Sequence, residues 1–324
     1  MTRPTFRQLF SLVGPFLGLL FVIGIFSIKP EVRAVFLTGG NFKIIFTQTV
    51  IVAIGALGMT LIIVSGGIDL SVGSVVALAS VVGAKLLSFS HPWSTPAVIA
   101  ATILAGGIVG AVNGSLIAGF RMMPFIVTLG MMGVARGAAK WLGDNQTVNY
   151  DEKAAVNTIM ALDEPYKFLP LPIGVWIVIG LAIVMAIVLR QTIFGRYVFA
   201  IGSNEATARL CGIRVRLQKI IIYSVAGLLF GTAGLMQLSR LTQGDPTVAI
   251  GLELDIIAAV VIGGASLSGG TGSILGSMIG ALIMAVLRNG SNQMGWPTYM
   301  QEIIIGIVIV LAVALDKFRQ GKQA

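Results

Sequence analysis

The hydrophobic and polar positions along the chain divide it into long apolar segments joined by shorter polar stretches. A helix needs about 20 apolar residues to cross a membrane. The segments that approach this length are 9–28, 44–64, 70–88, 96–118, 124–141, 171–189, 219–239, 252–264, 271–287 and 301–316. This pattern predicts an all-α, polytopic membrane protein with about ten transmembrane helices. About eight to ten of these helices are expected to cross the whole membrane. The eighth and ninth segments are short and rich in glycine, which is typical of broken or re-entrant helices.

The composition excludes the soluble classes of protein. Hydrophobic residues make up 56% of the 324 residues and charged residues only 11%, too few to cover a soluble enzyme or a nucleic-acid-binding protein. We therefore expect one transmembrane domain over residues 1–324 and no nucleic-acid partner. The net charge of +9 fits Lys and Arg gathered in cytoplasmic loops. With a single cysteine, Cys211, and a single histidine, His91, the chain offers no internal disulfide and no Cys/His metal site.

The distribution of charge predicts how the chain sits in the membrane. Lys and Arg gather before the first apolar segment, between residues 190 and 219, and at the carboxyl end, whereas most acids lie in segments on the opposite side, such as 143–170. The positive-inside rule then places both termini in the cytoplasm. The first apolar run is too long for the core of a signal peptide, so we expect it to be retained as a helix.

An internal repeat adds to this picture. Segment 64–84 aligns with segment 261–281, and both contain Gly-Gly-x-x-Leu-Ser-x-Gly between two apolar helices. About five predicted spans precede the midpoint and about five follow it, and an odd number of spans in a repeat reverses its orientation. We therefore expect two inverted five-helix repeats, about 9–141 and 171–316, with broken helices at corresponding points.

The Gly-Gly segments contain the candidate residues of a permeation path. Gly66 and Gly67 can end one helix, and Asp69 and Ser71 can cap the next through its free N–H groups. Such a break either lines a polar path or forms a tight turn between two helices, and the residues alone favour neither. The second copy lacks the acid, so a symmetric pair of carboxylates is not expected. The candidate path residues are Ser65, Gly66, Gly67, Asp69, Ser71, Gly263, Gly264 and Ser268.

Two other features concern packing and nucleotide binding. Gly272, Gly276 and Gly280 leave one helix face without side chains, which predicts close approach of another helix. No Gly-x-x-x-x-Gly-Lys-Ser/Thr motif occurs in the chain, so we expect it to bind no cofactor. If ATP drives this protein, another chain must bind the nucleotide.

The polar segment 190–218 contains a predicted short helix. Asn204 or Ser203 can cap its start, and Gly212 can end it. Its arginines suit either docking to a cytoplasmic partner or contact with anionic lipid headgroups. The residues alone leave both interpretations open.

Charged residues near the expected outer face form the last group of candidates. Glu253 and Asp255 lie at the outer mouth of the eighth segment and, being two residues apart, face different sides of a helix, which argues against a joint catalytic pair. Lys140 can extend its side chain to the outer surface, whereas Arg136 lies deeper and suggests a buried pairing role. No set of nucleophile, histidine and acid is present, so we expect no catalytic site.

Four motifs resemble those of the permease subunits of ribose-type (CUT2-like) sugar ABC importers, in the same order along the chain. They are MTLIIVSGGIDLSVGS (59–74), PFIVTLG (124–130) followed by Arg136-Gly137, GRYVFAIG (195–202) with the Asn204–Gly212 helix, and ELDIIAAVVIGG (253–264). The resemblance covers about residues 40–310 and so concerns nearly the whole chain.

The resemblance implies the membrane subunit of a binding-protein-dependent importer in a bacterial inner membrane. Such a permease forms a homodimer or heterodimer, docks on an ATPase with two nucleotide-binding modules, and receives a monosaccharide from a periplasmic or lipid-anchored binding protein. The coupling element of the family corresponds to Asn204, Glu205, Ala206, Ala208, Arg209 and Gly212, which favours docking over lipid contact. Thr207 and Cys211 stand where relatives more often have Ala and Ser, and all four side chains are small.

Two other classes of function compete with this interpretation. A secondary transporter with inverted repeats would work without ATP but needs an ion site within the bilayer. A membrane enzyme acting on lipid-linked substrates needs clustered acids or histidines near one face, whereas the acids here are scattered. ATP dependence of uptake separates the importer from both alternatives.

Overall fold

A computed structural model describes residues 6–88, 93–151, 153–162 and 169–320. The described residues form mainly α-helices, as the sequence predicts. The helices are α1 Phe6–Phe26, α2 Pro30–Phe36, α3 Gly39–Val64, α4 Val72–Ser88, α5 Thr95–Phe120, α6 Pro124–Leu142, α7 Ile173–Gln191, α8 Ile193–Ser203, α9 Glu205–Leu210, α10 Val215–Leu241, α11 Leu252–Ile262, α12 Ile274–Gln293 and α13 Thr298–Gln320. Each predicted apolar segment corresponds to one of these helices.

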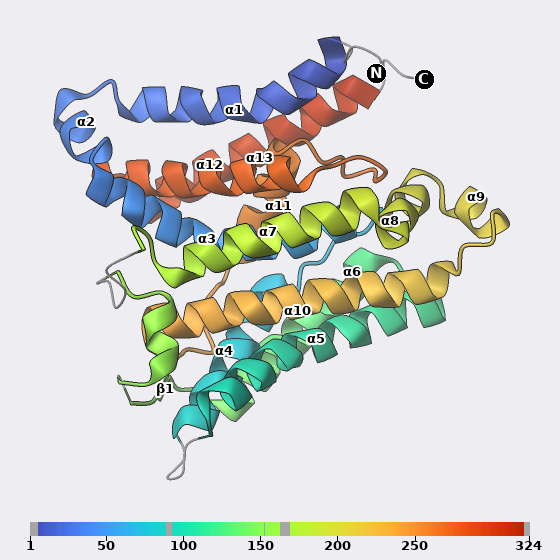
Figure 1. The fold of residues 1–324 in the computed structure, drawn as a ribbon, viewed down its shortest axis with the longest axis horizontal. Helices are drawn as coiled ribbons and strands as arrows, with labels where there is room; N and C mark the ends of the chain where they lie inside the picture. Colours follow the sequence, from blue (N-terminus) through green and yellow to red (C-terminus); the bar gives the residue numbers. More distant parts are fainter. Residues whose placement is uncertain (1–5, 89–92, 152, 163–168, 321–324) are drawn as a thin grey trace.

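The long helices run side by side between two ends of the molecule (Figure 1). One end carries α2 and the short strand β1, Val148–Asn149, which pairs with β2, Gln243–Gly244. The other end carries α8 and α9, and α1 begins and α13 ends there as well (Figure 1). The polar segment 190–218, the start of α1 and the end of α13 therefore lie on one side, which is the arrangement required by the predicted orientation. Arg3 and Lys322, which belong to the basic groups before the first apolar segment and at the carboxyl end, lie outside the described residues.

Helix length and burial separate the interior of the bundle from its lipid-facing surface. Five helices of the described residues, α3, α5, α7, α10 and α12, are long and apolar enough to cross a membrane. Helix α3 is the central one, because almost every side chain from Thr49 to Val64 is buried by other helices. On α5 and α7, in contrast, large apolar side chains such as Leu104 and Ile183 are exposed, as expected for surfaces that face lipid.

Glycine allows the closest helix contacts in the bundle. A Cβ atom at Gly276 would overlap the carbonyl oxygen of Gly263, and one at Gly280 would overlap that of Ala259. The predicted glycine face of α12 therefore packs against α11, as expected for small residues in membrane helices. A second close interface, between α5 and α10, was not predicted. There, a Cβ atom at Gly106 would overlap the carbonyl oxygen of Gly227.

Helix α11 has 11 residues and rises about 16 Å, roughly half the thickness of a bilayer core, as expected of a broken helix. Two other elements differ from the predicted boundaries. Helix α12 extends to Gln293 instead of ending near residue 287, because its polar last turns face the protein interior rather than lipid. The segment 190–218 was expected to contain one short helix but is mostly helical, because α8 occupies its first part. The hydroxyl oxygen of Thr192 caps α8 by accepting a hydrogen bond from the Gly195 amide at 3.2 Å.

Candidate functional site

The two Gly-Gly segments meet at one junction, together with the end of α8. The amide of Gly270 donates a hydrogen bond to the carbonyl oxygen of Val64, at 2.8 Å. A Cβ atom at Gly269 would lie 3.0 Å from the Cα of Gly66, and one at Gly202 would overlap the Val64 carbonyl oxygen. Gly66 and Gly269 have φ angles of +82° and +86°, a region that glycine enters readily. Backbone from three segments is thus in direct contact.

This junction corrects one step of the repeat argument. Inverted repeats would place equivalent turns at opposite ends of the molecule, but the turns after α3 and α11 touch each other at the end that carries α8. The shift that aligns 64–84 with 261–281 passes over an even number of predicted segments, so it pairs helices of the same direction. The alignment of the two segments was therefore wrong as an argument that the two halves have opposite orientations in the membrane. That residues 9–141 and 171–316 form inverted repeats stays a prediction, which this alignment does not support.

Asp69 lies inside the protein, next to this junction. It is 1% exposed, and its Oδ1 accepts hydrogen bonds from the backbone amide of Ser71 at 2.7 Å and from the Ser71 hydroxyl at 2.6 Å. Asn113 on α5 donates to the other carboxylate oxygen at 3.4 Å and to the Ser71 hydroxyl at 3.1 Å. The acid therefore fixes the chain before α4, as a turn does. Whether these residues also line a permeation path stays a prediction.

The other candidate path residues surround the same junction. Ser65 is buried and donates its hydroxyl to the Ile62 carbonyl oxygen at 2.8 Å. A Cβ atom at Gly67 would lie 2.5 Å from the Tyr223 hydroxyl. Gly264 has a φ angle of +92° and open space at its Cβ position, and Ser268 is exposed in the turn that follows. The structure thus brings the two sets of candidates together.

Helix α9 is built as the sequence predicts and projects from the end of the bundle (Figure 1). The side chain of Asn204 caps it by accepting the Thr207 amide at 2.9 Å, and Gly212 ends it with a φ angle of +83°. Leu210 is 88% exposed. Ala208 is buried against α8 and the start of α10. The helix is therefore anchored on one side and open on the other.

Glu205 holds α9 to α10 by charge. Its two carboxylate oxygens accept hydrogen bonds from Arg209 at 2.8 Å and from Lys219 at 2.7 Å. Burial raises the pKa of Glu205, but the hydrogen bonds and charges of Lys219 and Arg209 outweigh it, so the pKa lies below its usual value. Its contribution to stability is therefore present above the unfolded-state pKa of about 4.3 and is lost as the pH falls through the lower folded-state pKa.

The two outer-mouth acids lie on different sides of α11, as predicted, but Asp255 is not at the surface. Asp255 is 5% exposed, and its Oδ2 accepts hydrogen bonds from Nε and Nη2 of Arg288 at 3.0 and 2.6 Å. Glu253 points toward α4, because a Cβ atom at Gly73 would lie 2.6 Å from its Oε2. Arg288 was missed by the sequence analysis because it lies one residue beyond the predicted apolar segment 271–287, although a charged residue so close to such a segment is a recognisable signal.

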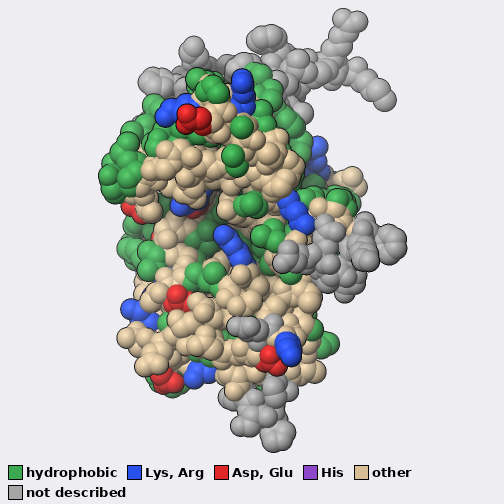
Figure 2. Space-filling model, turned by 90° about the vertical axis from the view of Figure 1, so that its left-hand side faces the viewer, with side chains coloured by type: hydrophobic (Ala, Val, Ile, Leu, Met, Phe, Trp, Pro, Cys, Tyr) green, Lys and Arg blue, Asp and Glu red, His purple; other side chains and the backbone are tan. Residues whose placement is uncertain are grey.

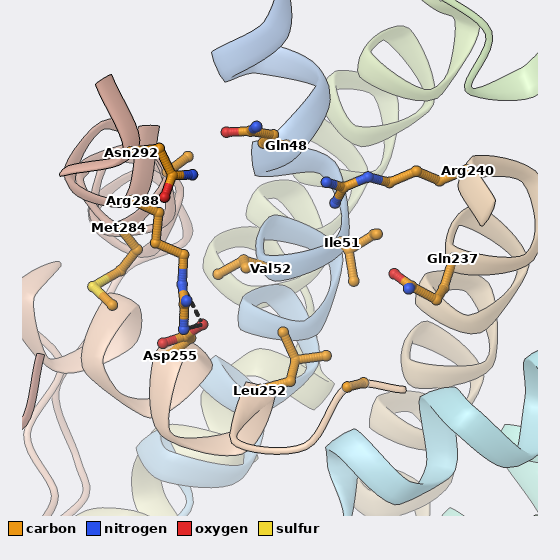
Figure 3. Close-up of a pocket in the computed structure, with 12 residues that line it drawn as sticks. Gln48, Ile51, Val52, Gln237, Arg240, Leu252, Asp255, Met284, Arg288 and Asn292 are labelled. Atoms are coloured by element: carbon orange, nitrogen blue, oxygen red, sulfur yellow. Dashed lines mark hydrogen bonds and ion pairs between the residues drawn. The ribbon is translucent and has the colours of Figure 1, made fainter. Parts of the chain in front are cut away.

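A cavity of about 220 Å³ opens beside the Asp255–Arg288 pair, between α3, α10, α11 and α12 (Figure 3). Gln237 and Arg240 of α10 face the ion pair from the opposite wall, and Gln48 of α3 lies between them (Figure 3). All belong to the end of the bundle that carries α2 and β1. In the view onto this end, Lys and Arg side chains appear between its upper and lower parts (Figure 2).

Arg136 has the pairing role that its depth predicted, but it is only half-buried and its partners are backbone groups. Its Nη1 donates to the carbonyl oxygens of Pro246 and Val248, at 2.8 and 2.7 Å. Glu253 and Asp245 add electrostatic attraction. The guanidinium thus fixes the segment between β2 and α11, next to the cavity.

Arg136→Met is expected to release this segment, since each carbonyl oxygen loses a charged donor, worth about 1.5–3 kcal/mol. Amide hydrogen exchange of residues 243–251 should become faster. Lys140→Met, one turn further along α6 at an exposed position, is the matched control and should leave exchange unchanged. Equal exchange in both variants would contradict the assigned role.

These observations define a class of protein: an all-α, multi-pass membrane protein with a short projecting helix at one end and a polar cavity toward the other. The chain belongs to the family described as branched-chain amino acid transport system / permease component, which matches residues 41–313. It is thus a permease component of a transport system.

Several curated proteins are similar over nearly the full chain. The ribose import permease protein RbsC of Escherichia coli K12 is 42% identical over 308 residues, 94% of this chain and 93% of the relative. The L-arabinose ABC transporter permease protein AraH of Azospirillum brasilense is 37% identical over 89% of this chain and 83% of the relative. The D-allose transport system permease protein AlsC of E. coli K12 is 33% identical over 94% of this chain and 91% of the relative. No solved structure matches the chain.

Proposed function

We propose that this chain is the membrane subunit of an ATP-driven importer for a monosaccharide, a ribose-like pentose or a related sugar. The observation that carries the proposal is the 42% identity to a ribose import permease over 94% of the chain. Relatives named for ribose, arabinose and allose all match most of the chain. A sugar is therefore favoured over the branched-chain amino acids of the family description.

Such a system needs other chains to hydrolyse ATP and to deliver the sugar, and these are the proposed partners. The chain has no phosphate-binding motif, so a separate cytoplasmic ATPase with two nucleotide-binding modules is proposed to hydrolyse ATP. A periplasmic or lipid-anchored binding protein delivers the sugar to the end with the cavity, and two permease chains form the dimer. The end with α8 and α9, and both termini, then face the cytoplasm of a bacterial cell.

Helix α9 is the proposed docking element for the ATPase. It projects beyond the bundle and exposes Leu210, while Glu205 ties it to Lys219 on α10. A force on α9 is passed to α8 through Asn204, whose amide donates to the Ala200 carbonyl oxygen at 3.1 Å. From α8, contact through Gly202 reaches both Gly-Gly turns. ATP binding in the partner then favours one arrangement of the bundle over the other.

The test is uptake by the permease reconstituted with its ATPase and binding protein, isolated together from the native host by pull-down in mild detergent. D-ribose, L-arabinose, D-allose and L-leucine are offered with and without ATP. ATP-dependent uptake of one of the sugars is expected. Uptake without ATP would favour a secondary transporter, and uptake of L-leucine alone would overturn the sugar assignment.

Glu205→Arg is expected to abolish uptake, because it converts two attractions into repulsion and reverses the charge that α9 presents. The protein should still reach the membrane, since Glu205 lies outside the bundle. Glu205→Gln keeps the size of the side chain and should have a smaller effect, because the exposed ion pairs it loses are each worth about 1 kcal/mol or less. Normal uptake by Glu205→Arg would contradict the docking role.

A further inference from the structure

We propose that the cavity between α3, α10, α11 and α12 is a sugar-binding site contained within a single permease chain. The inference rests on the proposed function and adds a place where the sugar pauses after it leaves the binding protein. Its basis is a set of polar side chains that face a shared space (Figure 3).

Three of these side chains have no hydrogen-bond partner among the described residues. They are Gln48, Gln237 and Arg240, and Gln237 is only 9% exposed. Gln48 is partly buried and Arg240 is exposed, so these groups are free to bond to a ligand that enters the cavity. Small-molecule sites typically contain a few precisely placed polar groups that fix the orientation of the ligand. The amide and guanidinium groups on the walls of this cavity fit that description.

The ion pair supplies the acceptor that a sugar needs. Both hydrogen bonds from Arg288 end on Oδ2 of Asp255, so Oδ1 is left to accept a bond from a ligand hydroxyl. Asn292 accepts a hydrogen bond at its Oδ1 from Gln301, at 2.7 Å, which leaves its amide donors for the cavity. The site therefore offers donors and acceptors together, as a ligand with several hydroxyl groups requires.

The remaining walls agree with a sugar. Ile51, Val52 and Leu252 provide apolar surface for the C–H faces of a sugar ring. Asp255 is the one carboxylate among the described lining residues and is paired with Arg288, so the lining keeps one excess positive charge, on Arg240. A ligand ammonium group would find no free anion there, whereas the Arg240 guanidinium can donate to the hydroxyl oxygens of a polyol.

The single cysteine of the chain allows a direct test of occupancy. The transporter, reconstituted with its partners, carries Cys211→Ala together with Gln237→Cys, and a membrane-impermeant maleimide labels it from the cavity side. D-ribose, L-arabinose, D-allose and L-leucine are added in turn. At twice its dissociation constant, a bound sugar should slow labelling of Q237C about threefold, since protection follows 1 + [L]/Kd. Ile250→Cys is the matched control, because Ile250 is 75% exposed near the same end.

Protection of Q237C but not of I250C supports the site. An unchanged labelling rate with every sugar, while the C211A/Q237C transporter itself still takes one of them up with ATP, overturns the site and leaves the proposed function intact. Equal protection of both thiols also overturns it, because the effect is then not local. Protection by L-leucine with no sugar uptake overturns both the sugar site and the proposed function.

A transport measurement checks the same site in a second way. Gln237→Leu keeps the shape of the side chain and removes its hydrogen bonds, so D-ribose uptake should fall about tenfold. Thr232→Val, on the same helix, is the control, because the Thr232 hydroxyl bonds to its own helix at Leu228, at 2.8 Å. An equal loss in both variants, or none in Gln237→Leu, would contradict the proposal.

Discussion

Gly202→Ala is expected to prevent correct assembly of the bundle and to abolish transport. The added Cβ atom would overlap the carbonyl oxygen of Val64 and lie 2.6 Å from the amide nitrogen of Gly270. Both are backbone atoms of the turns after α3 and α11, so no side chain can move aside. Overpacking of this kind costs about 1–3 kcal/mol even where relaxation is possible, and here the junction itself must open.

The measurement is the apparent melting temperature and yield of the permease in detergent, by size-exclusion chromatography, followed by uptake in proteoliposomes. Gly180→Ala on α7 is the control, because its Cβ position has nothing within 4 Å and alanine favours a helix by about 1 kcal/mol over glycine. A Gly202→Ala protein as stable and active as Gly180→Ala would contradict the close packing of α8 against both turns.

Arg288→Met is expected to destabilise the protein more than Asp255→Leu does. Removing one partner of a buried ion pair costs about 3–5 kcal/mol, because the other charge is left uncompensated. The Asp255 side chain is 7% exposed and that of Arg288 is 38% exposed, so a stranded Arg288 can turn toward the cavity whereas a stranded Asp255 cannot. The double variant removes both charges and should regain most of the lost stability.

Thermal stability of the wild type, the two single variants and the double variant forms a complete cycle. Strong coupling, with the double variant more stable than Arg288→Met alone, is the expected result. Additive losses would show that the two side chains do not depend on each other. Sugar uptake by the double variant should stay low even when it folds, because Asp255 supplies the hydroxyl acceptor of the proposed site.

Several features followed from the order of residues alone. The apolar segments located all the long helices, because a stretch of lipid-facing or buried helix must be apolar along its length. The start and end of α9 could be predicted from Asn204 and Gly212, since capping depends on neighbouring residues only. The glycine face of α12 was equally visible, because the four-residue spacing fixes which residues share a face.

Other features depended on contacts between distant segments and required the tertiary structure. The sequence could not show that Gly66, Gly202 and Gly269 meet, nor that Asp69 bonds to Asn113, because each pair is far apart along the chain. It also gave Asp255 a surface position, since the partner that allows its burial, Arg288, lies on another helix. A polar residue in or beside an apolar segment indicates that a polar partner exists, but the sequence does not identify which residue that partner is.

The sequence by itself determined the class of protein, its helices and the start and end of α9, because these depend on composition, periodicity and caps. Only the tertiary structure decided which turns touch, which charges pair, and where polar side chains from α3, α10, α11 and α12 enclose a cavity. The physical reason is that helix formation satisfies backbone groups within one segment, whereas a binding site is made by side chains that packing brings together from several.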